Sequence, residues 1–342
     1  MKSIALLGID LAKNIYHLHG VDGNGKCVYR KKVYRSDLLP LISQLKGCRI
    51  VMEVCGGANY WARKFEEVGH KVDLISPQYV KPFVMRNKND WKDAEAITVA
   101  ASQASMRYVP KKSEGQQDIQ NLHRIRERLV GSRTRLVNEM RGLLMEYGLV
   151  FPKGRQQFGK IFLEKFCEYE DRLSPLAIET FYDLWREYLD IDKRVLRYEK
   201  LICDYCKEHP VCQRLLKIPG IGPLTATALV AKVSDMNVFK NGREFSAWLG
   251  LTPREHSTGG KQVLLGISKR GDKYLRKLLV HGARITLRYV DKKTDRVSVR
   301  AGSLKKAKGT NKAAVALANK NARAVYVIMA KDQEYKTFPI AA

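Results

Sequence analysis

Long hydrophobic runs are absent from this sequence. After Met1 the first apolar stretch extends only from Ile4 to Ile9 before Asp10 interrupts it, which is too short for the core of a secretory signal peptide. No stretch approaches the ~18 apolar residues that suggest a membrane span. The seven cysteines are an odd number and lack the spacing of a disulfide framework, which favours a reducing compartment. We therefore expect a soluble, cytoplasmic protein with no membrane partner.

Acidic residues are scarce relative to basic ones. The 342 residues include 62 Lys and Arg against 35 Asp and Glu, which gives a net charge of +27. The excess is concentrated in residues 211–342, with 26 basic against 8 acidic side chains, and indicates a polyanionic partner such as nucleic acid. A basic face kept for solubility is the alternative. The length accommodates two or three domains, and we place them at 1–110, 111–210 and 211–342.

The first region has the pattern of an α/β domain. A predicted helix at 60–68 separates the last two of five predicted strands, and a turn at 22–25 joins the second strand to the third. The strands are expected at 4–9, 15–21, 27–34, 50–54 and 72–75. Three antiparallel strands followed by alternating strand and helix are the layout of a ribonuclease-H-like fold.

Four acidic residues occupy the positions where that fold gathers carboxylates. Asp10 and Glu53 lie on the first and fourth strands, and Asp90 and Asp93 share one face of a helix because they are three residues apart. Carboxylates are preferred ligands of Mg2+, and two such ions suit phosphodiester chemistry, so we predict a site for Mg2+ or Mn2+. As alternatives, Asp10 is a turn residue and Asp90 with Asp93 caps the helix. Glu53 needs a partner or a metal to offset its desolvation in an apolar strand.

The middle region predicts two long amphipathic helices, at 116–147 and from about Pro175. In the second helix apolar residues recur at spacings of three and four, the heptad pattern of a coiled coil. These residues are Phe181, Leu184, Tyr188, Ile191, Val195, Tyr198, Ile202 and Tyr205. Their partner is either the 116–147 helix or another subunit, and we expect a homo-oligomer, a dimer to tetramer, that assembles through this coiled coil.

The segment Ile218–Pro223 is typical of a helix-hairpin-helix element. Gly220 and Gly222 let backbone N–H groups approach a phosphate at the start of the next helix, near Thr225. Such an element binds DNA without reading its sequence. A tight turn between two helices, without a ligand, is the alternative.

Residues 252–271 combine small hydroxyl groups, glycines and cations. A hydroxyl at Ser257 or Thr258 has the surroundings of a nucleophile held against a phosphate, because nearby cations stabilise the charge that develops. These cations are Arg254, Lys261, Lys269 and Arg270. On the residues alone, a Gly/Ser phosphate-binding loop explains the pattern better. Beyond it we predict helices at 272–289 and 313–329, with a Lys/Gly-rich loop at 292–312 that contacts nucleic acid or is disordered.

Together these motifs resemble a transposase of the insertion-sequence-110 family, in its insertion-sequence-1111 branch. The resemblance runs nearly from end to end, in the same order. It implies a mainly α C-terminal domain with an essential serine, a central coiled coil and an N-terminal RuvC-like domain with a DEDD tetrad. It also implies a DNA recombinase that moves its own element. The motifs are Asp10, Glu53, Asp90-x-x-Asp93, the 219–222 turn, and residues 250–254, 257–260 and 265–271.

The resemblance also suggests partners. Double-stranded DNA is the substrate, an RNA encoded by the element guides some members, and composite sites form across subunits of a tetramer. We therefore expect a bacterial or archaeal protein associated with the nucleoid. Members of the other branch carry the serine where Thr258 stands. We assign the nucleophile to Ser257 because a primary hydroxyl is less crowded, and Thr258 stays open. A metal-dependent Holliday-junction-type nuclease without covalent serine chemistry is the competing function, and a structural nucleic-acid-binding protein is a third.

Overall fold

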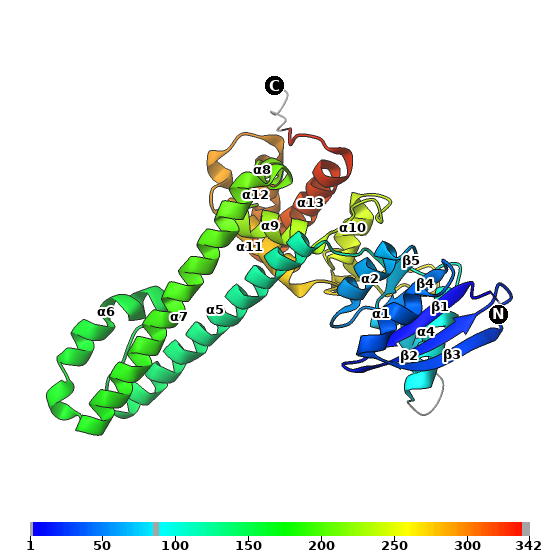
Figure 1. Ribbon diagram of the computed structural model, residues 1–342. Coiled ribbons are helices and arrows are strands. Elements are labelled where there is room, and N and C mark those ends of the chain that lie inside the picture. Colours follow the sequence, from blue (N-terminus) through cyan, green and yellow to red (C-terminus); the bar gives the residue numbers. More distant parts are fainter. Residues whose placement is uncertain (1–2, 85–88, 337–342) are drawn as a thin grey trace. The chain divides into compact units, whose positions relative to one another are not determined.

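A six-stranded sheet forms the centre of the N-terminal part of the chain, in the order β3-β2-β1-β4-β5-β6 (Figure 1). Strands β1, β2 and β3 are antiparallel, β4 and β5 run parallel to β1, and β6 is antiparallel to β5. The five strands expected from the sequence are confirmed, and β6 is an addition. Their bounds are β1 Leu6–Leu11, β2 Ile15–Val21, β3 Cys27–Tyr34, β4 Arg49–Glu53, β5 Lys71–Ile75 and β6 Tyr108–Val109.

The computed structural model describes residues 3–84 and 89–336, and the chain divides into two units. The N-terminal unit is Met1–Glu114 and the C-terminal unit is Gly115–Ala342. The boundary expected between residues 210 and 211 lies inside the C-terminal unit. In the described part of the chain, no helix has the length and apolar character that crossing a membrane requires.

Helices cover both faces of the sheet. One core cluster joins apolar residues of β1–β5 to helices α1 (Arg35–Ser43) and α2 (Ala58–Glu67). A second cluster joins the opposite face to α4 (Asp90–Ala101). The short elements α3 (Pro77–Val80) and η1 (Lys81–Phe83) precede α4. Because successive side chains of a strand point to opposite faces, β1, β2, β4 and β5 contribute residues to both clusters.

Gly8 determines how closely α4 approaches the sheet. A Cβ atom at this position would lie 2.7 Å from Thr98 Cγ2 and 2.8 Å from the Ala94 carbonyl oxygen. The missing side chain therefore lets α4 lie directly on β1. Asp10 follows Gly8 by two residues and points to the same face, so the first turn of α4 is held beside it.

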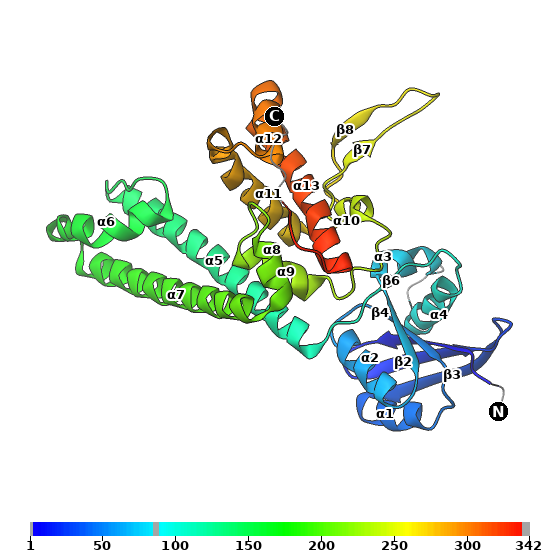
Figure 2. The same cartoon turned by 90° about the horizontal axis from the view of Figure 1, so that it is seen from above.

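Two long antiparallel helices begin the C-terminal unit and lie side by side (Figures 1 and 2). They are α5 (Glu114–Glu146) and α7 (Pro175–Glu208), and ion pairs join Arg126 to Glu199 and Arg133 to Asp192. Between them in sequence are α6 (Arg155–Cys167), which the sequence did not predict, and η2 (Glu170–Arg172). Apolar residues of α5, α6 and α7 form one core cluster. Within the chain, the heptad stripe of α7 therefore packs against α5 and α6.

The remaining helices form a separate core with the C-terminal end of α7. Their bounds are α8 Pro210–Leu216, α9 Pro223–Lys232, α10 Gly242–Trp248, α11 Lys273–Arg288, η3 Val290–Lys292, α12 Arg296–Lys308 and α13 Thr310–Lys331. A two-stranded hairpin of β7 (Pro253–Glu255) and β8 (Leu264–Ile267) lies between α10 and α11.

The prediction of a loop at 292–312 is corrected by the structure, because most of this segment is helix α12. Asp295 caps this helix by accepting hydrogen bonds from the N–H groups of Val297 and Ser298, both at 3.0 Å. Ser298 and Ala301 are its buried residues. Lysine is a good helix former, so the high lysine content did not exclude a helix capped in this way.

A buried histidine ties α5 to this core. His123 Nδ1 and Nε2 lie 2.9 Å from the Tyr274 hydroxyl of α11 and the Thr227 hydroxyl of α9, respectively. Thr227 donates its proton to the Pro223 carbonyl at 2.7 Å, so its oxygen can accept from His123. Burial lowers the pKa of His123 to about 4, and the charges of Arg126 and Lys232 add to this effect. The imidazole is therefore neutral at pH 7.

Candidate functional site

Three carboxylates meet at one edge of the N-terminal sheet. Asp10 near the end of β1 and Asp90 and Asp93 in the first turn of α4 have oxygen atoms within 4.8 Å of one another. Asp90 is exposed, and Asp10 and Asp93 are half-buried. Hard oxygen donors at this spacing fit a divalent cation such as Mg2+ or Mn2+. The positive end of the α4 dipole also favours negative charge at this place.

The capping role that the sequence left open belongs to Asn89. Its side-chain oxygen accepts a hydrogen bond from the Trp91 N–H at 3.1 Å, and its carbonyl accepts from the N–H groups of Lys92 and Asp93. Asp90 follows as the first residue of α4. Neither aspartate is therefore required to cap this helix.

Glu53 ends β4, the strand next to β1. It follows Met52, which is in register with Ile9, and so it lies beside the end of β1. Burial, followed by the charges of Glu53 and Asp10, raises the pKa of the Cys55 thiol, so both carboxylates act on one neighbour. Within residues 3–84 and 89–336, the metal-compatible group contains the three aspartates and does not include Glu53. A ligand role for Glu53 stays a prediction.

Two histidines of β2 adjoin the acids, and sequence reasoning did not identify them. His17 is in register with Asp10, is 6% exposed, and has its Nδ1 atom 3.9 Å from Asp90 Oδ2. This buried Nδ1 has no hydrogen-bond partner in the described structure. The ring centroids of His17 and Trp91 lie 4.7 Å apart. An unsatisfied buried nitrogen directed at an acidic cluster is a candidate for orienting a metal ligand.

His19 is the second of these histidines. Its Nδ1 lies 2.9 Å from the Thr98 hydroxyl of α4. Burial lowers the pKa of His19, against an opposing effect of Glu95 and with a smaller contribution from Arg30. His17 and His19 are two residues apart in a predicted strand, and this spacing was a signal from which the sequence could have placed both on one face of the sheet.

The second candidate group lies on the β7–β8 hairpin, which projects from the helices around it in the C-terminal unit (Figure 2). Ser257 donates a hydrogen bond to Glu255 Oε1 at 2.7 Å, and Gln262 donates to the same oxygen at 3.1 Å. These hydrogen bonds hold the pKa of Glu255 below its usual value. The Thr258 carbonyl accepts from the Lys261 N–H at 3.0 Å in the turn. Glu255 is a neighbour of the serine that the sequence analysis did not identify.

Comparison with known proteins gives a consistent family assignment. Residues 7–149 match a family model for transposases of the DEDD type of IS110. Residues 212–297 match a second model, described as the IS116/IS110/IS902 family of transposases. The chain is 46% identical over 337 residues to the transposase for insertion sequence element IS1111A of Coxiella burnetii, covering 98% of this chain and 92% of that protein. It is also 44% identical to a probable family 20 transposase of Pseudomonas aeruginosa, covering 98% and 99%, and 38% identical to the transposase for insertion sequence element IS1328 of Yersinia enterocolitica, covering 96% and 97%.

The chain belongs to the IS110 family of transposases. It is therefore an enzyme that binds DNA, cuts it and transfers its strands, and the resemblance seen in the sequence is confirmed. The ribonuclease-H-like fold expected for its N-terminal unit agrees with the match to the DEDD type.

The cations predicted to hold DNA are spread along the hairpin of this IS110-family transposase. Arg254 lies on β7, Lys261 near the tip, and Lys269 and Arg270 at the base, and all four are exposed. Two glycines form the base. A Cβ atom at Gly250 would overlap the Arg270 carbonyl, and one at Gly271 would overlap the Trp248 carbonyl. Binding of DNA by these cations stays a prediction.

The expected helix-hairpin-helix turn lies between α8 and α9. Gly220 has a φ of +89°, and a Cβ atom there would lie 2.7 Å from the Gly282 carbonyl oxygen of α11, so packing on α11 explains this glycine. Around Gly222 the space is open. Thr225 has a buried side chain, and its N–H donates to the Gly222 carbonyl at 2.9 Å. Phosphate binding by the turn stays a prediction.

Proposed function

We propose that this transposase excises and inserts its own element with metal-bound carboxylates and a serine nucleophile. Asp10, Asp90, Asp93 and Glu53 hold the metal, and Ser257 attacks the DNA. The observation that carries the metal part is the convergence of the three aspartates from β1 and α4 to within 4.8 Å. These residues are about 80 positions apart in sequence, and similarity to DEDD transposases extends across this region.

The metal, Mg2+ or Mn2+, would offset the charge of the phosphate and stabilise the oxygens that attack and leave. The chain's own contribution is positional. Packing at Gly8 sets the distance between β1 and α4, and the Asn89 cap fixes the first turn that carries Asp90 and Asp93. His17 Nδ1 lies 3.9 Å from Asp90 Oδ2 and is suited to orient that carboxylate.

Ser257 is the proposed nucleophile, and its contact with Glu255 supports this choice over Thr258. The serine oxygen forms a bond to phosphorus, and the bond from phosphorus to one strand end breaks. The hydroxyl proton goes to Glu255, and the released strand end leaves as a hydroxyl after taking a proton from solvent. The next strand end reverses these steps, which conserves the phosphodiester bond. Arg254 and Lys261 on the same hairpin are suited to stabilise the phosphate charge.

Replacing Ser257 with alanine tests this chemistry, with Thr258→Ala as the matched control. We expect Ser257→Ala to abolish excision of the element in cells and the covalent protein–DNA species on denaturing gels. Thr258→Ala should retain both. Excision by Ser257→Ala at the wild-type level would refute the serine role. A Holliday-junction-type nuclease would cleave without forming an adduct, and relatives matched over nearly the whole chain, all named transposases, do not favour it.

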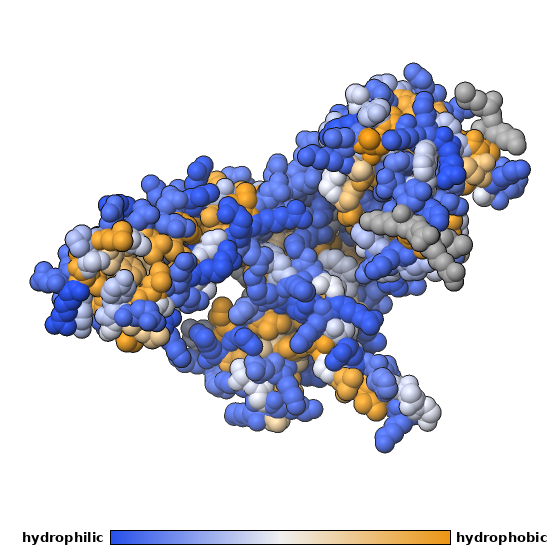
Figure 3. Space-filling model, turned by 90° about the horizontal axis from the view of Figure 1, so that it is seen from below, coloured by the Kyte–Doolittle hydropathy of each residue, from blue (hydrophilic) through white to orange (hydrophobic). Residues whose placement is uncertain are grey.

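Two further parts of the proposal concern partners. The family resemblance supports a guide RNA from the element, and sequencing the nucleic acid that copurifies with the protein tests it. Self-association, from dimer to tetramer, was expected through the coiled coil. Because much of the heptad stripe of α7 packs within the chain, we propose instead that it involves the hydrophobic residues at the far end of the α5–α7 arm (Figure 3). Exposed apolar residues in this part of the arm are Leu143, Met145, Tyr147, Val150, Leu163 and Leu176. Light scattering of the purified protein, compared with a variant carrying serine at Val150 and Leu176, tests the oligomer.

A further inference from the structure

A single row of the sheet links the acidic site to the outer strand. Asp10 of β1 is in register with His17 of β2, and His17 is in register with Lys32 of β3. Residues paired in this way point to the same face of a sheet. Lys32 therefore lies on the face that carries Asp10 and α4. Two rows along, Arg30 is paired with His19 and has the same orientation.

The spacing of these residues suits a nucleic-acid backbone. Neighbouring strands lie about 4.8 Å apart, so the backbone of Lys32 is about 10 Å from that of Asp10. A DNA strand covers this distance within a few nucleotides, since its charges lie about 3.4 Å apart along the helix axis. The guanidinium of Arg30 lies 5.2 Å from the ring centre of Trp91, the residue that follows Asp90. Stacking of this kind orients the guanidinium and leaves its edge available for a phosphate.

Both cations are exposed and available. Among the residues that the structure describes, neither Arg30 nor Lys32 has an acidic side chain within ion-pair distance. Among the strands of residues 3–84 and 89–336, β3 is the edge of the sheet. Carboxylates alone repel a phosphate backbone, and a substrate that reaches them needs cations along its path.

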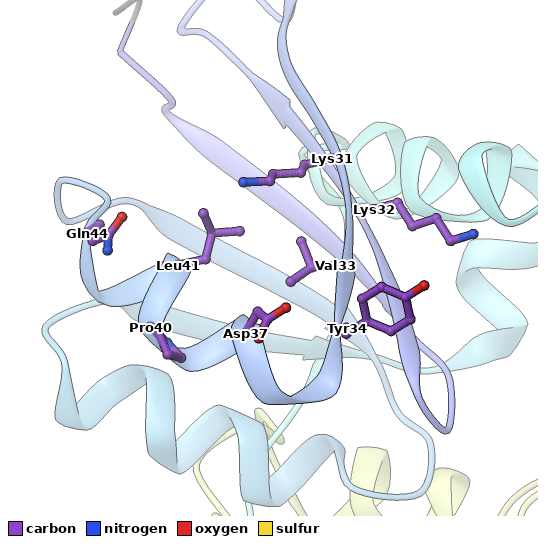
Figure 4. Close-up of a pocket in the computed structure, with 8 residues that line it drawn as sticks. All are labelled: Lys31, Lys32, Val33, Tyr34, Asp37, Pro40, Leu41 and Gln44. Carbon is purple, nitrogen blue, oxygen red and sulfur yellow. The ribbon is translucent and has the colours of Figure 1, made fainter.

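Lys31 provides an internal comparison. Its side chain leaves β3 on the side opposite to that of Lys32 (Figure 4). Both lysines border a cavity of about 260 Å3 between β3 and α1. This cavity lies on the α1 face, where Val33 and Leu41 line it, and not on the face of the acids. Lysines on an edge strand also prevent pairing with other sheets, but that role does not depend on the face to which they point.

We propose that Arg30 and Lys32 bind the phosphate backbone of the DNA strand that enters the carboxylate site. This inference rests on the proposed function, because it takes the three aspartates as the place of strand cleavage. The bound strand passes the first turn of α4, where Asp90 is exposed, and continues to β3, with the scissile phosphate at the aspartates and flanking phosphates at Lys32 and Arg30.

The test compares Arg30→Ala/Lys32→Ala with Lys26→Ala/Lys31→Ala, which removes the same charge from the same hairpin. The probe is a labelled DNA duplex spanning one end of the element, and its affinity is measured without divalent metal at several salt concentrations. Each phosphate contact contributes about 0.9 to the slope of log affinity against log salt. We expect the first variant to lower this slope by about 1.8. When the salt is raised from 50 to 200 mM, the factor by which DNA affinity falls would then be roughly tenfold smaller for this variant than for the wild type.

Several outcomes decide the proposal. The Lys26/Lys31 variant and the charge-retaining Arg30→Lys/Lys32→Arg variant should keep the wild-type slope. An unchanged slope in Arg30→Ala/Lys32→Ala, or an equal fall in the Lys26/Lys31 variant, would overturn the inference. A fall seen with RNA of the same sequence but not with DNA would also overturn it. Mn2+ binding distinguishes a failure of this inference from a failure of the proposed function. Loss of Asp10 and Asp93 should abolish Mn2+ binding, whereas loss of Arg30 and Lys32 should not.

Discussion

Replacing Gly8 with alanine should loosen the carboxylate site without touching a carboxylate. The new Cβ would lie 2.7 Å from Thr98 Cγ2 and 2.8 Å from the Ala94 carbonyl, closer than real Cβ contacts. One of the two neighbours is backbone, so α4 must move away from β1. Asp90 and Asp93 move with it, whereas Asp10 stays on the strand.

The expected cost follows from the packing. Inserting one carbon into a filled interface destabilises it by about 1–3 kcal/mol. If the strain is relieved by local opening of α4, hydrogen exchange of its amides accelerates by about 5- to 150-fold. Mn2+ affinity should fall as well, since ligands from β1 and α4 no longer meet in one geometry. Exchange of residues 90–101, followed by mass spectrometry, together with Mn2+ titration, measures both effects.

Two companion variants test the cause. Thr98→Ser removes Cγ2 and keeps the hydroxyl that contacts His19, so adding it to Gly8→Ala should recover part of the loss, with a coupling of about 0.5 kcal/mol or more. Gly23→Ala is the control, because no atom lies within 4 Å of its Cβ position, and it should change stability by less than ~0.5 kcal/mol. Unaltered exchange and Mn2+ affinity in Gly8→Ala would refute the close approach of α4 to β1.

Two further predictions concern histidines. His17→Ala should weaken Mn2+ binding by about 10- to 100-fold because it removes the nitrogen beside Asp90. His17→Asn keeps an N–H donor and should retain part of the lost Mn2+ affinity. Equal Mn2+ affinity in the wild type and both variants would exclude a positioning role for His17. His123 has a folded pKa of about 4, below the ~6.5 of an unfolded histidine, so its contribution to stability is present above pH 6.5 and is lost as the pH falls toward 4. Urea unfolding should show a loss of about 2 kcal/mol between pH 7 and pH 5 that is absent in His123→Gln, and identical pH profiles would contradict this.

The N-terminal sheet was largely predictable because its strands are apolar or alternate strictly. Helix α1 was not predicted, since it contains Pro40 and is only nine residues long. Helix α6 was missed because its phenylalanines follow a Pro–Lys–Gly break and the segment appeared polar. In α12 the Asp295 cap outweighed a Lys- and Gly-rich composition. In each case a local signal was weaker than the tertiary contact or cap that decides the structure.

The site was predictable to the extent that residue type implies chemistry. Asp10, Asp90 and Asp93 were selected because this fold gathers carboxylates at one edge of the sheet and because carboxylates are preferred ligands of Mg2+. His17 was not identified, because its relation to Asp10 depends on the register of β1 with β2, which the sequence does not specify. The same limit applies to Arg30 and Lys32, whose alignment with the acids appears only when β3 is placed beside β2.

The two proposed catalytic groups differ in how firmly they are held. The aspartates are attached to a sheet and a helix whose contact is fixed by packing at Gly8, so their geometry exists before DNA binds. Ser257 lies on a hairpin whose residues 253–266 are all exposed, and its polar contact there is with Glu255 of the same hairpin. Ordering such a segment has an entropic cost, which must be offset by the surface or strand that it contacts in the active complex. If Ser257 is the nucleophile, as we propose, binding of DNA therefore has to position it before it can attack.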